Sequence, residues 1–324
     1  MSTQYKKIKK EFRFGQLSEL DIRRELHTVG GIQIYSAKKG ELNIHRASID
    51  ITPTIVALSS RYGMLQTVYV KKSQYINSYY IYVKPRDTVL IVSNEYIHIP
   101  NYIAGYVTSR VTNVAKGFGH ICTTIDPNWR GGLLIGLSNP SNRTIKIEVG
   151  TSIIIHKEGD RSIVVDNKPL ATITFHYLST RLNDNNSIYS SLRSDLLRKY
   201  RYDQKRGAKA LIWKLIHFRR KRFTDYFYEY LDANEEKMKD RLGWYAFLNE
   251  FSIFNANSPG SNNNSSATNY IVCESLINKA YILMQNHRSF LITLIILILL
   301  VLLKLGIISD DLLKEILRYL EATK

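Results

Sequence analysis

The chain has 324 residues, of which 44% are apolar and 11% aromatic, so it can hold one large domain or two ordinary ones and is too apolar for global disorder. Lys and Arg number 45 against 28 Asp and Glu, and the net charge of +17 favours an acidic partner such as a nucleotide, nucleic acid or anionic lipid. The two cysteines, Cys122 and Cys273, exclude a disulfide framework and, without clustered histidines, a structural zinc site.

Residues 1–180 are predicted to form a mainly β domain. Between residues 17 and 178, short runs rich in β-branched and aromatic residues alternate with Gly, Pro, Asn and Asp. This pattern is typical of a sandwich or barrel rather than of βαβ units. One short helix is expected in LSELDIRREL, where Ser18 is a candidate N-cap and Asp21 follows three residues later.

Residues 181–252 are predicted to form a basic helical region, because apolar residues recur there at positions i, i+3, i+4 and i+7. The segment Ser191–Arg220 contains ten Lys or Arg residues against two Asp residues. Three interpretations of this segment are open. It forms a solvated helix face, it binds anionic lipid, or it binds nucleic acid through aromatic side chains that interleave with the charges. The hydrophobic stretch that follows favours lipid, so nucleic acid is the weaker alternative.

The C-terminal part is predicted to anchor the chain in a membrane. Residues 253–270 are an Asn/Ser-rich stretch typical of a flexible linker. Within residues 271–324, the apolar segment 289–308 would span about 30 Å as a helix, a hydrocarbon thickness. The alternative is a helix buried inside a protein bundle. An amphipathic tail follows.

The expected location is a membrane, with a single-pass C-terminal anchor. The charges on the two sides of the segment 289–308 nearly balance, so they do not fix its orientation. The first fifteen residues lack the apolar core of a signal peptide, which predicts that the N-terminal domain is cytoplasmic.

Three stretches, in this order, resemble the dCTP deaminase/dUTPase superfamily. They are ASIDITPTI (Ala47–Ile55), YVKPRDTVLIVSNEYIHIPNYIAGYVTSRV (Tyr82–Val111) and TTIDPNWRGGLLIGLSNPSNRTIKIEVG (Thr123–Gly150). The resemblance implies a distorted β-barrel or jelly-roll that forms a homotrimer, with nucleotide sites between subunits. It also implies a pyrimidine deoxynucleotide, dCTP or dUTP, bound together with Mg²⁺; no metal ligands of the protein itself are expected.

The resemblance assigns a catalytic role to Asp126, which falls on the Asp of the family's "I-D" turn. There a carboxylate accepts the sugar hydroxyl and, in dUTPases, helps to position the attacking water. The alternative is that Asp126-Pro127-Asn128 only makes a turn. Trp129 matches an aromatic position that packs against the sugar, and its alternative is a tryptophan of the barrel core.

The remaining candidate nucleotide-binding residues also come from the resemblance. Ser109 and Arg110 fall at the family's Arg-Ser-Ser triphosphate motif, although in altered order, and Thr112 is a substitute for a missing Ser. Arg makes forked hydrogen bonds to phosphate oxygens, which suits this role. Asn139 matches the Asn that ends the third motif.

Two departures from the family pattern bear on catalysis. Gly136 stands where the deaminases have the glutamate that acts as general base, and Gly131–Asn139 contains no other acid, so deamination is disfavoured. The dUTPases' C-terminal arm has no good counterpart. A faint likeness to the deaminases' lid exists in Arg198–Ala210, where Lys199, Tyr200 and Gln204 would cover the triphosphate.

The sequence therefore leaves three functions open. The first is an enzyme, a dUTP diphosphatase or a dCTP deaminase-like protein. The second is a catalytically inactive nucleotide sensor that controls a membrane-attached effector, and the third is a scaffold without a ligand.

Overall fold

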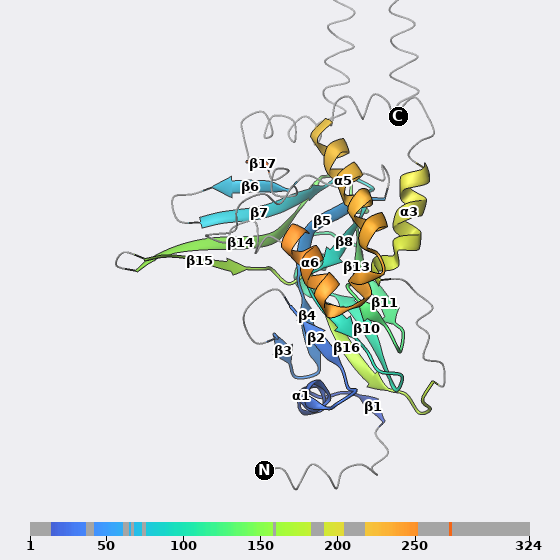
Figure 1. Ribbon diagram of the computed structural model, residues 1–324. Coiled ribbons are helices and arrows are strands. Elements are labelled where there is room, and N and C mark those ends of the chain that lie inside the picture. The colour runs from blue at the N-terminus through green and yellow to red at the C-terminus, as the bar shows by residue number, and fades with distance from the viewer. Residues whose placement is uncertain are drawn as a thin grey trace, which may run out of the picture. The chain divides into compact units, whose positions relative to one another are not determined.

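The computed structural model in Figure 1 describes residues 14–36, 42–60, 65, 68–72, 76–157, 160–182, 191–203, 218–251 and 272–273. Met1–Cys273 form one compact unit, and Glu274–Lys324 form another. The predicted boundary at residue 180 therefore lies inside a single unit. The predicted linker 253–270 and membrane span 289–308 lie outside the described residues.

The described strands form four open sheets. The largest is antiparallel with the order β11–β10–β16–β4–β3, and β1 pairs with His176 and Tyr177 of β16, beyond the residues that pair with β4. Its strands are β1 (Gly15–Gln16), β3 (Ile44–His45), β4 (Ser48–Ile51), β10 (Ile103–Ser109), β11 (Cys122–Ile125) and β16 (Ala171–Tyr177). A second sheet has the order β12–β9–β2, from β2 (Gln33–Tyr35), β9 (Tyr96–His98) and β12 (Arg130–Gly131).

The two other sheets hold the centre of the fold and a projecting hairpin. The central sheet has the order β13–β8–β5 and consists of β5 (Pro53–Ser59), β8 (Thr88–Ser93) and β13 (Leu134–Ser138). Every residue of β5 is buried, so both its faces are covered. The fourth sheet has the order β15–β14–β7–β6–β17, from β6 (Tyr69–Lys72), β7 (Ile76–Val83), β14 (Ile145–Lys157), β15 (Asp160–Asp166) and β17 (Val272–Cys273). Figure 1 shows β14 and β15 projecting to the left as a hairpin.

The mainly β prediction is confirmed. The barrel prediction is met only in part, because the described strands form separate sheets that do not close. Within the described part of the chain, no helix is long and apolar enough to cross a membrane.

The predicted first helix is confirmed as α1 (Glu19–His27). Ser18 is its N-cap and forms a capping box with Asp21: the Asp21 N–H donates to Ser18 Oγ, and the Ser18 N–H donates to the Asp21 carboxylate. The two hydrogen bonds satisfy backbone groups that the first turn of a helix leaves without partners.

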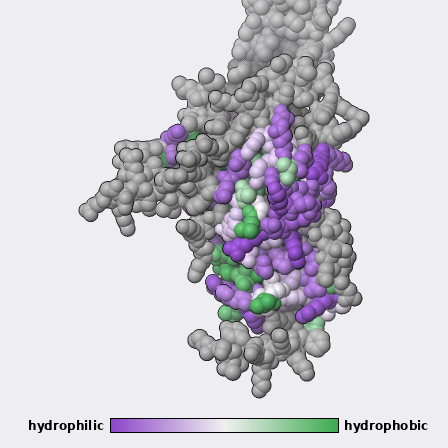
Figure 2. All heavy atoms as spheres, viewed as in Figure 1, coloured by the Kyte–Doolittle hydropathy of each residue, from purple (hydrophilic) through white to green (hydrophobic). Residues whose placement is uncertain are grey.

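In the predicted helical region 181–252, the described residues 191–203 and 218–251 are mostly helical. It contains η2 (Ser191–Arg193), α3 (Ser194–Asp203), α5 (Phe218–Asn234), η3 (Lys237–Lys239) and α6 (Arg241–Phe251). These helices pack on the β region, since α6 contacts β5 and buries Trp244, Phe247 and Phe251. On the face shown in Figure 2, the described surface is mainly hydrophilic and is interrupted by small hydrophobic areas.

Candidate functional site

A buried ion pair lies at the end of β10. Arg110, the N-cap of α2 (Val111–Ala115), forms an ion pair with Asp50 of β4. The two strands are neighbours of β16, which aligns Asp50 with Thr172 and Thr172 with Thr108. The Asp50 side chain is 1% exposed and that of Arg110 is 28% exposed, so the cation reaches the surface over a buried anion.

Two further side chains bind the Asp50 carboxylate. Asn43 Nδ2 donates to Asp50 Oδ2 at 2.8 Å, and His45 Nε2 lies 2.9 Å from the same oxygen. A buried carboxylate is stable only when such partners compensate for the loss of water. The carboxylate in turn fixes the guanidinium, and Arg has donors beyond the Nη1 that faces Asp50.

Asp50 and His45 were not among the residues that the sequence singled out. Asp50 lies inside the Ala47–Ile55 motif, which indicated the fold but no site. One feature of the sequence could have indicated Asp50, namely an acid between two isoleucines in a predicted strand. In the structure Ile49, Asp50 and Ile51 are all buried. A buried acid usually has a charged partner.

Ser109 and Thr112 differ in what they can offer to a ligand. Ser109 Oγ accepts from the Ile121 N–H at 2.6 Å, so it closes the segment that runs from β10 through α2 to β11. Thr112 is exposed on α2, two residues after Arg110. Of the two hydroxyls, that of Thr112 is therefore the better placed to contact a phosphate beside Arg110.

Asp126 and Trp129 lie in one tight turn after β11. The Trp129 N–H donates to the Asp126 carbonyl at 3.2 Å, and Asn128 has a positive φ of 65°. The structure therefore shows the turn expected from Asp-Pro-Asn, and it leaves the Asp126 side chain exposed. Trp129 is 9% exposed and its Nε1–H donates to the Gly131 carbonyl at 3.3 Å, so it is a core residue in this chain.

Asp126 and Arg110 do not meet within one copy of the chain. In the antiparallel pair β10–β11, Gly105 is opposite Ile125 and Thr108 is opposite Cys122. Asp126 therefore follows one end of the ladder and Arg110 follows the other. Six residues of strand separate them, about 20 Å at 3.3 Å per residue.

Asn139 lies outside this surface. It is 0% exposed, and its Nδ2 donates to the Val83 and Lys84 carbonyls at 3.0 and 2.9 Å. Its Oδ1 accepts from the Ser141 N–H at 3.1 Å. The amide shapes the loop between β13 and β14, so we do not include Asn139 in the candidate site.

Gly136 lies in the middle of β13, opposite Leu90 of β8. A Cβ at this position would lie 3.5 Å from Leu90 Cδ2 and 3.9 Å from Thr88 Cγ2, which are ordinary contacts. Packing therefore does not require a glycine here. Its hydrogen side chain cannot accept a proton.

The structure describes only part of the predicted lid. Lys199 is exposed on α3, whereas the Tyr200 side chain and Gln204 lie outside the described residues. Among the side chains that the structure describes, no group of three or more His, Cys, Asp or Glu could hold a metal ion.

The comparisons with known proteins point to one family. The sequence model of the dCTP deaminase-like family matches residues 16–154, which is less than half of the chain. No curated protein matches the chain.

Solved structures similar to this chain include dUTPases of Staphylococcus phages. The bacteriophage 80alpha dUTPase is 14% identical, with a TM-score of 0.29, over 50% of this chain and 100% of its own. Its complex with dUpNHpp has the same identity and TM-score and is covered over 92% of its length. A mutant dUTPase of phage phi11 of S. aureus, described with a structural Mg(II) ion, is 14% identical, with a TM-score of 0.28, over 49% and 99% of the two chains.

The match to the family's sequence model covers α1, Asp50, Arg110 and Asp126. The domain that contains residues 16–154 is therefore similar to the dCTP deaminase-like family.

Proposed function

We propose that this domain binds a pyrimidine deoxynucleoside triphosphate, dCTP or dUTP, together with Mg²⁺, and either acts on it or senses it. The observation that carries the proposal is the ion pair of Arg110 with the buried Asp50. It presents a fixed, half-buried guanidinium at the position of the family's triphosphate motif. A guanidinium binds phosphate oxygens through forked, charge-assisted hydrogen bonds.

We propose that the complete site forms between two copies of a homotrimer. Asp126 and Arg110 occupy opposite ends of the β10–β11 ladder, so one copy cannot offer both to the same nucleotide. The edge strand β11 has exposed side chains at Cys122, Thr123 and Thr124, and Tyr106 of β10 is 38% exposed. This surface is available to a second copy.

Of the reactions the family performs, dUTP hydrolysis suits these residues better than deamination. The exposed carboxylate of Asp126 can orient a water, whereas Gly136 offers no base. The alternative is a catalytically inactive module that senses the nucleotide, or a scaffold, and controls a membrane-attached effector. Gly136 and the altered order of the Ser109-Arg110 motif favour this alternative.

Product analysis separates these functions. The full chain is incubated with Mg²⁺ and either dUTP or dCTP, and the products are identified by chromatography and mass. Release of dUMP identifies a hydrolase, and conversion of dCTP to dUTP identifies a deaminase. Nucleotide recovered on the protein without a product identifies a sensor. If neither product nor bound nucleotide is found, the proposal fails and the scaffold remains.

The role of Asp126 is tested by Asp126→Asn, which keeps the size of the side chain and removes its charge. If the wild type releases dUMP, the turnover of this variant should be at least 100-fold lower, which is the usual effect of losing a general base. Unchanged turnover would show that Asp126 only makes the turn.

We also propose that residues 289–308 anchor the chain in a membrane, with the nucleotide-binding domain in the cytoplasm and the basic helices near anionic lipid. The proposal rests on the unbroken apolar stretch in the sequence. Deletion of residues 286–324 should release the protein from isolated membranes. Persistent membrane binding of this truncation would instead implicate the basic helical region.

A further inference from the structure

We propose that helix α6 is coupled to the Arg110 site through a buried polar network of Thr52, Asn94 and Glu95, and that Trp244 responds when the site is occupied. This inference rests on the proposed function and adds a regulatory output to it. The helical region would then take part in the response to nucleotide.

The network begins next to the site. Thr52 follows Asp50 by two residues and joins β4 to β5. Glu95 accepts from the Thr52 N–H at 3.0 Å and from Thr52 Oγ1 at 2.6 Å. Asn94 Nδ2 donates to the Pro53 carbonyl at 2.6 Å, and the Asn94 N–H donates to the Thr52 carbonyl at 2.8 Å. These hydrogen bonds tie the chain two residues beyond Asp50 to Asn94 and Glu95, so they offer a path by which a displacement of Asp50 reaches that segment.

The network ends on the helices. Trp244 Nε1–H donates to the Asn94 carbonyl at 3.1 Å, and the indole is 0% exposed. Tyr96 Oη donates to the Lys239 carbonyl at 3.0 Å. The segment Asn94–Tyr96 is thus bonded to the site strand on one side and to η3 and α6 on the other.

The fit of the indole is tight enough to transmit a shift. A Cβ on Gly132 would lie 2.1 Å from Trp244 Cη2, so the ring occupies the space of a side chain. Gly132 directly follows β12, the strand that leaves the turn containing Asp126. Close-packed contacts of this kind do not deform gradually, so a small shift at one end displaces the other.

The charge at Glu95 supplies a way for phosphate to act on the network. Glu95 is 3% exposed, and burial, with a smaller contribution from the nearby Asp50 charge, raises the pKa of its carboxyl to about 7 despite the hydrogen bonds from Thr52. Both protonation states are then accessible at neutral pH. When Arg110 also binds phosphate, it neutralises less of the negative charge of Asp50. The remaining negative charge favours the protonated form of Glu95, and protonation changes the hydrogen bonds between Glu95 and Thr52.

The test uses the full chain labelled with 5-fluorotryptophan and observed by ¹⁹F NMR. The chain has 3 tryptophans. Loss of one resonance in each single Trp→Phe variant assigns Trp129, Trp213 and Trp244. The probe is dUpNHpp with Mg²⁺, and its binding is measured on the same samples by calorimetry. In the wild type, the Trp244 resonance should shift in proportion to bound nucleotide.

Thr52→Val and Thr54→Val form a matched pair. Each replaces a hydroxyl by a methyl, at positions two residues apart, but only Thr52 bonds to Glu95, whereas Thr54 Oγ1 accepts from the Val56 N–H at 3.1 Å. Thr52→Val should bind the probe and reduce the Trp244 shift at least threefold. Thr54→Val should keep the wild-type shift.

The outcomes separate the two proposals. If the wild type binds no probe, the proposed function fails and the coupling fails with it. If the probe binds while the Trp244 resonance stays in place, or shifts equally in Thr52→Val, the coupling alone is wrong and the nucleotide site stands.

Discussion

Glu95 makes the stability of the protein depend on pH in an unusual direction. Its folded pKa of about 7 lies above the ordinary 4.5, because burial penalises the charged form. Because the folded state holds this proton more tightly than the unfolded chain, Glu95 contributes most to the free energy of unfolding below pH 4.5. Between pH 4.5 and the folded pKa of about 7, that contribution is lost at about 1.4 kcal/mol per pH unit.

We therefore expect Glu95→Gln to remove this pH dependence. The difference in unfolding free energy between Glu95→Gln and the wild type should move by about 3 kcal/mol in favour of the variant between pH 4.5 and pH 8. Urea unfolding of both proteins across this range measures it. A constant difference would show that Glu95 is ionised in the fold at a normal pKa.

Two glycines that lie four residues apart should respond oppositely to alanine. Gly132→Ala drives a methyl group against the buried indole of Trp244 and should destabilise the fold by about 3 kcal/mol. At Gly136 the same methyl group meets only ordinary contacts, and the smaller entropy of the unfolded chain should stabilise Gly136→Ala by about 0.5 kcal/mol. Thermal unfolding of both variants tests the pair. Equal effects would contradict the contact with Trp244.

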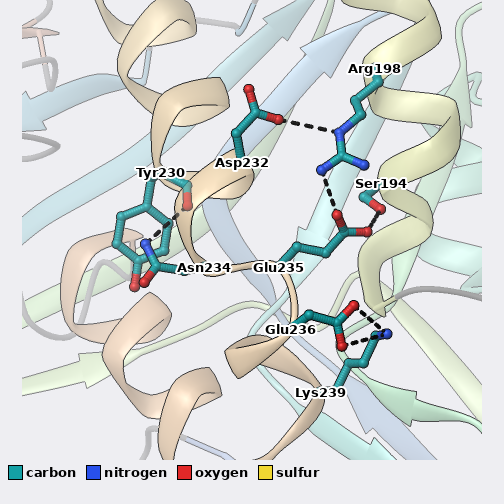
Figure 3. A network of polar contacts seen from close by, with 8 residues as sticks. All are labelled: Ser194, Arg198, Tyr230, Asp232, Asn234, Glu235, Glu236 and Lys239. Carbon is teal, nitrogen blue, oxygen red and sulfur yellow. Dashed lines mark hydrogen bonds and ion pairs between the residues drawn. The ribbon is translucent and has the colours of Figure 1, made fainter.

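At the scale of elements, a polar network holds α3 against the end of α5 (Figure 3). Glu235 accepts from Ser194 Oγ and pairs with Arg198, which also reaches Asp232. Burial opposes ionisation of Glu235, but the bonds from Ser194 and Arg198 outweigh it, so the pKa of Glu235 lies below its usual value. The network is therefore formed at neutral pH and is lost as the pH falls through that lowered pKa.

Glu235→Gln should loosen α3. Arg198 is 45% exposed, so the pair is screened and its loss should cost no more than about 1 kcal/mol. Hydrogen exchange of the α3 amides should accelerate about fivefold, the rate equivalent of that energy. Glu236→Gln is the control, because Glu236 is 81% exposed and pairs only locally with Lys239. Equal exchange in the two variants would exclude a role for Glu235 in docking α3.

Local patterns in the sequence predicted the elements better than their arrangement. The capping residues Ser18 and Asp21 indicated α1 because a cap depends on neighbours a few residues apart. Strand β10 (Ile103–Ser109) shows the limit of local patterns, because its place in the sheet depends on a distant partner. Its pairing with β16 is a contact between segments some 70 residues apart, which no local pattern reports.

The site could be predicted only in part for the same reason. Arg110 and Asp126 were found because they lie in motifs with a recognisable spacing. Asp50 and Glu95 were missed because their significance comes from burial and from partners on other strands. Trp129 and Asn139 match their motifs, but the fold uses both inside the core.

At the scale of the whole molecule, the separation of Asp126 and Arg110 predicts complementation between copies. Asp126→Asn and Arg110→Ala should each bind nucleotide weakly. After the two variants are unfolded together and refolded, about a quarter of the sites should recover both wild-type side chains, as a head-to-tail ring of subunits requires. Calorimetry with dUpNHpp and Mg²⁺ counts the recovered tight sites. No recovery in verified mixed trimers would mean that the two residues do not share a site.

The most direct test of the central claim is the binding of dUpNHpp and dCTP, each with Mg²⁺, to the full chain and to two arginine variants. Arg110→Ala removes the guanidinium that pairs with Asp50, and Arg143→Ala removes an exposed guanidinium from the loop before β14. The wild type and Arg143→Ala should bind at least one of the two nucleotides equally well. Arg110→Ala should bind it at least tenfold more weakly, the cost of a charged hydrogen bond. Failure of the wild type to bind either nucleotide, or equal affinity in Arg110→Ala, would contradict the account.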